Sequence, residues 1–471
     1  MRVDILFKGM CFMIGFVNNA IKHVTNNKLE YVLDNIHFRR NRQWPFPTFI
    51  NFMLFRKRTT LRHSIHSMYK LLCKFHFEKV SSSDFSQQRR YIDPNAFKVI
   101  SKEFLKNIGI ADKKKTLKTF KGKRVFAGDG SDLEILNLIS TRFAFNVKLK
   151  KNNYTYPAIA KFSAVMDVLN GYLLDGILGD FKEGDLPLSH ENLKNIVGLV
   201  DFANSIFTYD RGYVGLELYA RLLELGTNFV IRLKKGVYKE EINNMKSDDE
   251  IVRLKLTDER LDKFHDPELK AKYEKQEYIE LRVVKTKVKV IRIDEETGRE
   301  YEDEVDEILL TNMSKEEMSV EDLKYIYKLR WGIEVNFNTL KHRFNIENFT
   351  GTIKITHQQD LYSQFLTYNL FCYINNLLNL KLEKRFVNKY GEDYLDYDFE
   401  YKINQANLIR NLLEDIAAIM LMPLREHVSF LLNNLFTEAL EDPIKTKKIR
   451  HEKHDSKKNW QKFRQNCKPM S

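Results

Sequence analysis

The sequence predicts an α/β protein with a mixed sheet flanked by helices, a β-rich insertion and helical regions at both ends. Three observations carry this prediction. Apolar residues recur at helical spacing in residues 1–115, and again in 360–380 and 405–422. Short strand-like runs alternate with helical runs in residues 116–235. A highly charged stretch at 236–306, with strand-like pieces such as "YIELRVVKTKVKVIRI", interrupts the alternation.

The net charge predicts a polyanionic partner. The chain has 471 residues, enough for about two to four domains or one elaborated core, and its 43% hydrophobic content supports a real core. Its 77 basic and 64 acidic residues give +13. Basic residues cluster in "RRNRQ" at 39–43, in "FRKRTTLRH" at 55–63 and in the tail at 444–471. A disordered, solubilising extension is an equal alternative for the tail.

The cysteines and the apolar runs predict a soluble, cytoplasmic protein. The four cysteines lie far apart without a CxxC pair, which argues against a zinc ribbon or a disulfide framework. The opening "MRVDILFKGMCFMIGFV" is interrupted by Asp4 and Lys8 and has no small-residue cleavage site, so we expect a core helix there. No uninterrupted apolar run of about 18 residues follows, so no membrane span is expected.

Residues 1–115 are predicted to form a helical N-terminal DNA-binding region. Three stretches have apolar residues at helical spacing: "PFPTFINFMLF", "TLRHSIHSMYKLLCKF" and "DPNAFKVISKEFLKNIG". Short helices joined by tight turns beside Arg89 and Arg90 are typical of a helix-turn-helix DNA reader. A plain helical bundle is the alternative.

Residues 116–235 are predicted to hold the first part of the core. "RVFAGDGSDLEI" indicates a strand that ends in a turn, and "YPAIAKFSAVMDVLNGYLLDGILGD" indicates two paired strands joined at Asn170-Gly171. The strands "NSIFTYD" and "NFVIRLKK" then alternate with helices. This pattern predicts a three-strand antiparallel meander that leads into a β-α-β-α alternation.

The rest of the chain is predicted to complete the core around an insertion. Residues 236–306 form the β-rich insertion, with a turn at Thr297-Gly298. Residues 307–385 return through "DEILLTNM" to the core, and 386–471 form a helical C-terminal region with a basic tail.

The stretch "YKLRWGIEVNFNTLK" predicts a helix with an unusual polar stripe. At about 100° per residue, four polar side chains fall within roughly 60° of one another on a helical wheel. They are Tyr327, Arg330, Glu334 and Lys341. The alternative is a solvated face with an Arg330–Glu334 pair that contributes only a few tenths of a kcal/mol.

Two aspartates occupy places that complement this stripe. Asp129 ends the predicted strand "RVFAGD", and Asp210 ends "SIFTYD". Carboxylates at strand ends can converge at one edge of a sheet, and a helix packed across it adds Glu334. Such oxygen ligands suit Mg²⁺ or Mn²⁺, and two ions about 4 Å apart would serve phosphodiester chemistry. Each aspartate can also belong to an ordinary turn, and the rival acids nearby are Asp132, Glu134, Asp167, Asp175 and Asp180.

These residues together resemble a known family. The spacing Y-x2-R-x3-E-x6-K is similar to the signature of the YREK group of insertion-sequence DDE transposases. "AGDGS", "YDRGY" and "SSSDFSQQRRYIDPNAF" resemble the family's first-Asp, second-Asp and N-terminal contexts, so that the resemblance covers residues 80–350. It implies an RNase H-like catalytic core, divided into residues 116–235 and 307–385, with the β-rich domain inserted before the glutamate helix.

The resemblance also assigns roles to residues. Asp129, Asp210 and Glu334 would be catalytic and would hold two Mg²⁺ or Mn²⁺ ions. The residues that would contact DNA are Tyr327, Arg330 and Lys341, together with Arg89 and Arg90 of the N-terminal region.

The implied function is cut-and-paste DNA transposition. The protein would bind the terminal inverted repeats of its element, cleave strands with a metal-activated water and transfer the freed 3′-OH to target DNA. Its partners would be double-stranded DNA and a second copy of the chain in a synaptic homodimer, with no membrane, in the bacterial cytoplasm at the nucleoid. The alternatives are an RNase H-like nuclease that does not transpose and a DNA-binding regulator without catalysis. A glycosidase with paired carboxylates fits the basic stripe less well than phosphate chemistry does.

The sequence departs from the family in its inserted domain. Some relatives stack a tryptophan of that domain on a flipped base during hairpin formation. No tryptophan occurs in residues 236–306 of this chain. Tyr273, Tyr278 or Tyr301 would have to replace it, or the hairpin route does not operate.

Overall fold

The structure is a computed structural model. It describes residues 5–34, 36–39, 44–75, 77–110, 117–147, 157–293, 300–392, 394, 397, 399–422 and 424–447. Three predicted features lie wholly or partly outside these residues: the Thr297-Gly298 turn, most of the basic stretch at 39–43, and the tail from residue 448 onward.

A mixed eight-stranded sheet forms the centre of the described part of the chain. β3, β2 and β1 pair antiparallel, β1, β4 and β5 pair parallel, and β8, β7 and β6 continue the sheet antiparallel. The predicted α/β class, with its antiparallel meander followed by parallel strands, is therefore confirmed. In spatial order the strands are β3 (Leu173–Gly179), β2 (Ala158–Asp167), β1 (Arg124–Ile135), β4 (Ser205–Tyr209), β5 (Asn228–Arg232), β8 (Glu300–Thr311), β7 (Tyr278–Ile293) and β6 (Asp249–Lys255).

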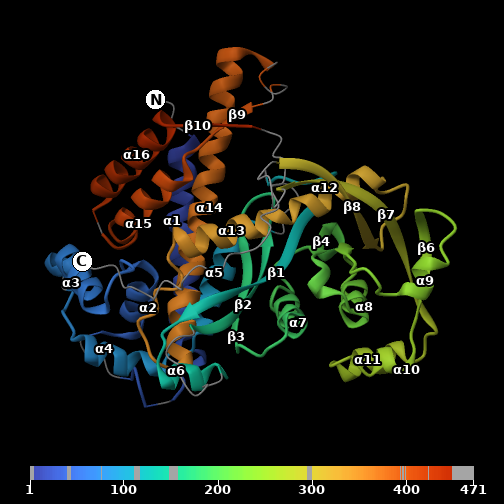
Figure 1. Cartoon of the computed structure of the whole chain (residues 1–471). Helices are drawn as coiled ribbons and strands as arrows, with labels where there is room; N and C mark the ends of the chain where they lie inside the picture. Colours follow the sequence, from blue (N-terminus) through green and yellow to red (C-terminus); the bar gives the residue numbers. More distant parts are fainter. Residues whose placement is uncertain are drawn as a thin grey trace.

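The predicted insertion is β-rich, and its strands extend the core sheet. β8 pairs with β5 through Val230–Thr311 and with β7 along its whole length. Three short helices accompany these strands, and α11 packs against α8 (Leu216–Glu224) of the core. The sheet therefore runs without interruption from the core into the insertion, seen at the green and yellow side of Figure 1. The helices are α9 (Lys239–Asn243), α10 (Asp258–Leu261) and α11 (Pro267–Tyr273).

Helices cover the sheet on both faces. Alternate residues of a strand point to opposite faces, so Val125, Ile206 and Val230 share one face of neighbouring strands. These three pack with Leu323 and Ile326 of α12 (Val320–Leu329) in one apolar cluster. Phe126, Phe207 and Phe229 face the main core instead. The helix α7 (Asp185–Asn195) packs against β1, β2 and β3, and α6 (Ile139–Ala144) against β2.

Several N-terminal helices pack against the long helix α14. All four predicted N-terminal helices are present, as α1, α2, α3 and α5, and α1, α2 and α5 contact α14. Their buried apolar side chains join those of the sheet in one core, and Figure 1 shows α1 beside α14. The helices are α1 (Ile5–Asn26), α2 (Phe46–Phe55), α3 (Leu61–Leu72), α4 (Ser82–Gln88), α5 (Asn95–Asn107) and α14 (Lys354–Tyr390).

A buried ion-pair network fastens the N-terminal region to α14. Asp360 accepts hydrogen bonds from the guanidinium groups of Arg56 and Arg89, each at 2.8 Å, and from the backbone N–H of Thr350 at 2.7 Å. Burial alone would raise the pKa of Asp360, but Arg89 and Arg56 hold that pKa well below its usual range. The carboxylate therefore stays charged inside the protein because its partners are charged too.

This network changes the prediction for Arg89. Its side chain is 1% exposed. Its Nε, Nη1 and Nη2 groups donate to Gln359, Thr350, Thr356 O and Asp360. Four of the five guanidinium donors are used in this way and the side chain is buried, so the geometry gives Arg89 a packing role rather than a DNA contact. Arg90 is exposed, and its predicted DNA contact stays a prediction.

The described part of the C-terminal region contains two helices and a small sheet. The helices are α15 (Gln405–Leu421) and α16 (Arg425–Glu441), which pack against each other and on α14. The small sheet is an antiparallel pair of β9 (Phe399–Lys402) and β10 (Ile444–Lys447). The first residues of the basic tail therefore form a strand. Within the described residues, no helix is long and apolar enough to cross a membrane.

Asp360→Asn is expected to destabilise the fold by about 3–5 kcal/mol, because it leaves two buried guanidinium groups without their counter-charge. Chemical denaturation monitored by circular dichroism measures the loss. The lowered pKa of Asp360 also means that its stabilisation is present at neutral pH and is lost as the pH falls through the folded pKa.

The matched control is Asp262→Asn, which removes a carboxylate from an exposed pair with Lys270. Exposed pairs contribute at most about 1 kcal/mol, so this variant should unfold close to the wild type. Equal stability of Asp360→Asn and the control would contradict the structural role of the network.

Candidate active site

The register of two parallel strands brings Asp129 and Asp210 together. The ladder between β1 and β4 ends at the pair Gly128–Tyr209, so Asp129 and Asp210 are the next residues on neighbouring strands. Asp129 follows Val125 by four residues and Asp210 follows Ile206 by four, so both carboxylates belong to the face that α12 covers. Asp210 follows the end of its strand as predicted. Asp129 does not end β1, because β1 continues to Ile135 in its ladder with β2.

Glycines make room for the side chains around this pair. A Cβ on Gly128 would lie 2.1 Å from the ring of Tyr209, so only glycine allows this close approach. A Cβ on Gly130 would lie 2.8 Å from a carboxylate oxygen of Asp185, the first residue of α7. The "AGDG" segment therefore lets an aromatic ring and a further carboxylate approach the backbone beside Asp129.

The polar stripe lies on two helices rather than on one. α12 ends at Leu329 and α13 (Trp331–His342) begins after Arg330, where the N–H of Arg330 bonds Tyr327 O and the N–H of Ile333 bonds Arg330 O. The single predicted helix is therefore wrong at Arg330, where two i to i−3 bonds tighten the turn. Glu334 consequently lies in the first turn of α13 instead of mid-helix.

Arg330 joins two of the three predicted carboxylates. Its Nη2 donates to Glu334 Oε1 at 2.9 Å, and its Nη1 lies 3.3 Å from Asp129 Oδ2. Arg330 is only 5% exposed, so this contact is shielded from water. Asp210 accepts a hydrogen bond from the N–H of Gly212 at 2.7 Å, which fixes the turn that carries it.

The pKa of Asp129 shows that the three carboxylates interact. Burial raises this pKa to about 7 from an ordinary value of 3.8. The positive charge of Arg330 and a hydrogen bond from the Gly130 N–H oppose the rise, while the charges of Asp210 and Glu334 add to it. A carboxyl group that titrates near neutrality beside two others is typical of functional sites.

The remaining predicted site residues surround this centre. Lys341 donates from Nζ to the backbone oxygen of Asp132 at 2.6 Å, which ties α13 to β1. Tyr327 is 6% exposed, and its ring lies 5.7 Å from the guanidinium of Arg330 and 6.0 Å from that of Arg232. Arg89 lies in the network on α14 and is not part of this site.

Most rival acids are engaged elsewhere. Asp167 pairs with Arg124, Asp175 with Lys98, and Asp180 with Lys354. Asp132 pairs with Lys161 at the surface. Burial raises the pKa of Glu134, and the nearby charge of Glu347 raises it further.

Sequence reasoning missed two groups at the centre, Asp185 and Tyr213. The Tyr213 hydroxyl is buried, and no residue that the structure describes forms a hydrogen bond with it. Burial raises its pKa well above the ordinary value, and the charges of Asp129, Asp185 and Asp210 add to that rise. Tyr213 follows Asp210 by three residues, so its place near the site could be inferred from the sequence. Asp185 reaches the site only through the packing of α7, which the sequence does not reveal.

The donor set fits a divalent cation in chemical type. Carboxylate oxygens are the ligands that Mg²⁺ and Mn²⁺ prefer, and such ions bind through few carboxylates plus waters and substrate phosphates. In the arrangement described, Arg330 lies between Asp129 and Glu334. Accordingly, among the residues that the structure describes, no three His, Cys, Asp or Glu side chains stand ready to hold a metal ion.

The three tyrosines of the insertion differ in exposure. Tyr273 on α11 is 4% exposed and lies against Phe264, and Tyr278 at the start of β7 is half-buried beneath Arg253. Tyr301 on β8 is 47% exposed. Tyr301 is therefore the most accessible of the three for stacking, and that role stays a prediction.

A comparison with known protein families identifies the family of this chain. The family model described as "Transposase DDE domain" matches residues 121–370, more than half of the 471 residues. The chain belongs to the DDE transposase family. The enzyme is therefore a DDE-type transposase, and the matched range includes Asp129, Asp210, the insertion and Glu334. Domains of this family generally use divalent metal ions.

A solved structure of another transposase is similar in fold to this chain. It is a cryo-EM structure of the piggyBac transposase synaptic complex with hairpin DNA. The identity is 12% and the TM-score 0.41, over 90% of this chain and 84% of that one. No curated protein matches the sequence.

Asp129→Asn is expected to remove a pH dependence of folding. Between about pH 4 and about pH 7 the unfolded chain ionises this carboxyl while the folded transposase keeps it protonated. The raised pKa of Asp129 therefore adds its full contribution to the free energy of unfolding below about pH 4. This contribution is lost as the pH rises through about 7. Relative to the variant, the wild-type free energy of unfolding should fall by roughly 2–4 kcal/mol across this range, at about 1.4 kcal/mol per pKa unit. Urea denaturation at a series of pH values measures both proteins, and parallel curves would contradict the raised pKa.

Proposed function

We propose that this transposase binds the ends of its element and catalyses metal-dependent strand cleavage followed by strand transfer, as in cut-and-paste transposition. Asp129, Asp210 and Glu334 act as the catalytic carboxylates. The observation that carries the proposal is the convergence of these three side chains where β1, β4 and α13 meet, with Arg330 between two of them. The core built from β1–β5 is the RNase H-like part of the chain.

The carboxylates would hold two Mg²⁺ or Mn²⁺ ions. Bound ions of this kind activate an attacking oxygen and stabilise the leaving oxygen of a phosphodiester. The chain contributes the ligands and the rigid strands and helix that fix their spacing. Asp129 and Asp210 are held by the end of the parallel ladder, and Glu334 by the first turn of α13.

The reaction consists of two displacements at phosphorus. Water attacks the phosphate at the element end, the bond to the 3′ oxygen breaks, and a free 3′-OH results. That 3′-OH then attacks a target phosphate, and the target strand leaves with its own 3′-OH. Each step needs positive charge near the phosphate oxygens, which Arg330 and Lys341 supply as DNA contacts alongside Tyr327.

The partners follow from this chemistry. They are double-stranded DNA, at the element ends and at the target, and a second copy of the transposase that brings two ends together. Arg90 of the N-terminal region is exposed and is a further DNA contact. The reaction takes place at the bacterial nucleoid.

Two alternatives are less well supported. An RNase H-like nuclease that does not transpose would share the carboxylates, and a regulator without catalysis would not need them. The family match favours a transposase over both.

Glu334→Gln is expected to reduce Mg²⁺-dependent strand cleavage by more than about 100-fold while DNA binding is retained. Removing a residue that is hydrogen-bonded to a metal ligand lowers metal affinity or activity by about 10–100-fold, so removing the ligand itself should lower activity more. The assay follows cleavage of a labelled duplex made from the DNA that flanks the gene, and a gel shift without metal measures binding.

Asp132→Asn provides the matched control, since Asp132 is a carboxylate on the same strand as Asp129 but pairs with Lys161 at the surface. It should cleave at close to the wild-type rate. Normal cleavage by Glu334→Gln would refute the assignment of Glu334.

A further inference from the structure

β6 is the last strand of the eight-stranded sheet and forms its edge in the insertion. It pairs with β7 on one side, and no strand that the structure describes pairs with its other side. Figure 1 shows β6 at the outer end of the sheet, away from the N-terminal helices. The opposite end differs, because β3 is buried along its whole length and packs against α5, α7 and α14. Of these two edges, the one at β6 is open to another chain.

The register of β6 on β7 determines which backbone groups face outward. The N–H of Leu256 bonds the oxygen of Glu277, and the N–H of Lys285 bonds the oxygen of Asp248. Hydrogen-bonded pairs alternate along an antiparallel ladder. The even-numbered residues of β6 therefore bond β7, and the odd-numbered residues direct their N–H and C=O groups away from it.

Two central residues of this edge have free backbone groups. Side chains of neighbouring segments donate to the carbonyl oxygens near its ends, those of Asp249 and Lys255. Between them, the N–H and C=O groups of Ile251 and Arg253 have no hydrogen-bond partner among the described residues. A sheet edge with unpaired donors and acceptors is a template for a further strand.

The side chains of this edge are complementary to a second copy of the same strand. β6 begins with the acids Asp249 and Glu250 and contains the bases Arg253 and Lys255 in its second half. Ile251 lies between the two groups and is 65% exposed, although large apolar side chains on an edge strand favour association. When two such strands run antiparallel, the acidic half of each lies beside the basic half of the other.

We propose that β6 pairs antiparallel with β6 of a second copy of this chain, about a twofold axis at Val252. The inference rests on the proposed function, in which two copies bring two element ends together. In this register the free N–H and C=O of Ile251 face those of Arg253 in the second copy, and the reverse, which gives four hydrogen bonds. Asp249 lies opposite Lys255 on each side of the axis, and opposite charges across neighbouring strands stabilise their pairing.

The charge pattern favours this partner over a parallel arrangement of the two strands. A parallel pairing in the same register would place the acidic halves side by side, and like charges directly opposite one another destabilise a sheet. Strand addition takes its affinity from main-chain hydrogen bonds and its specificity from alternate side chains. Here both sets of groups match those of the strand itself.

The size of the contact makes the pairing weak in free solution. β6 has seven residues, whereas a stable interface uses about 20–30 residues on each side. Two copies bound to the ends of one DNA molecule have a high effective concentration, which favours a weak contact between them. The edge would therefore join two transposases mainly when both are bound to DNA.

The test is sedimentation velocity of the full chain without DNA, at concentrations up to about 100 µM, where a complex with a micromolar Kd forms. The wild type should change from monomer towards dimer as its concentration rises. Ile251→Pro should stay monomeric, because proline removes an outward N–H and none that bonds β7. Lys255→Glu should raise the Kd of the dimer about tenfold or more, because a carboxylate then lies opposite Asp249 at two places.

Lys263→Glu is the matched control for charge. It makes the same change on an exposed side chain beside α10, away from the edge of β6, and should keep the wild-type Kd of the dimer. Circular dichroism shows whether each variant is folded.

The outcomes separate this inference from the proposed function. A wild type that stays monomeric would overturn the pairing and leave the edge to an extended segment of another protein. A wild-type Kd in both folded β6 variants would overturn it too, because another surface would then hold the dimer. An equal loss of dimer in Lys263→Glu would do the same, since the effect would follow net charge. The proposed function fails separately, if the wild type does not cleave element-end DNA with Mg²⁺.

Discussion

The ion pairs of Arg330 are the interaction on which the site depends. Asp129 and Glu334 come from β1 and α13, and two like charges drawn together in a partly buried place repel each other. The guanidinium of Arg330 compensates both at once and is itself shielded from water. Arg330 lies at the turn where the chain passes from α12 to α13. Because its guanidinium contacts both Asp129 on β1 and Glu334 on α13, this turn also brings the two carboxylates together.

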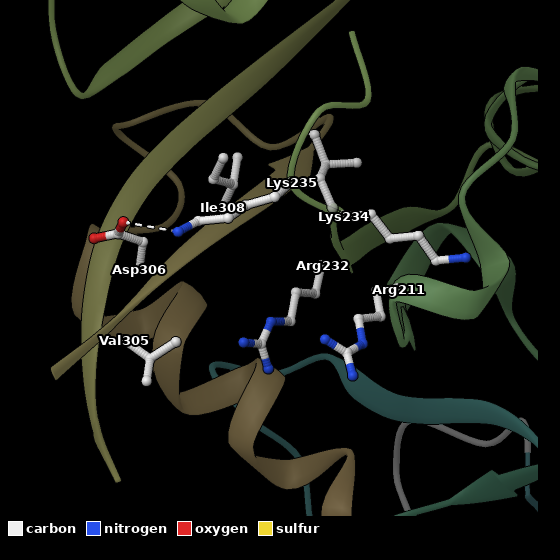
Figure 2. A pocket seen from close by; sticks show the side chains of 8 residues that line it. Arg211, Arg232, Lys234, Lys235, Val305, Asp306 and Ile308 are labelled. Atoms are coloured by element: carbon white, nitrogen blue, oxygen red, sulfur yellow. Dashed lines mark ion pairs between the residues drawn. The ribbon is translucent and has the colours of Figure 1, made fainter. Parts of the chain in front are cut away.

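The rest of the fold holds this contact in place. The face of β1, β4 and β5 that carries Val125, Ile206 and Val230 packs against α12 and so holds this helix on the sheet. The insertion joins the sheet at β5 through β8, and Val284 and Leu309 of its strands pack in the same apolar cluster as α12. A cavity lined by residues of β5, β8 and the turn after Asp210 lies where the insertion meets the core sheet (Figure 2).

The sequence predicted the parts of this arrangement that local patterns encode. Strand alternation located β1, β4 and β5, and the spacing of Tyr327, Arg330, Glu334 and Lys341 identified the stripe. The parts that depend on tertiary pairing escaped it. β1 runs past Asp129 because β2 pairs with it there, Arg89 is buried because Asp360 lies on a helix 271 residues away, and Asp185 arrives through the packing of α7. The break at Arg330 escaped because apolar periodicity continues across it.

We propose above that Asp129, Asp210 and Glu334 together hold the divalent ions, which requires Arg330 to release its two carboxylates. Crystals of the transposase soaked with Mn²⁺ test it most directly, because anomalous diffraction locates the ion. We predict a peak bonded to oxygens of these carboxylates at about 2.0–2.2 Å, and the loss of that peak in Glu334→Gln. A peak that involves none of the three side chains, or one that persists unchanged in Glu334→Gln, would contradict the assignment of these residues as metal ligands.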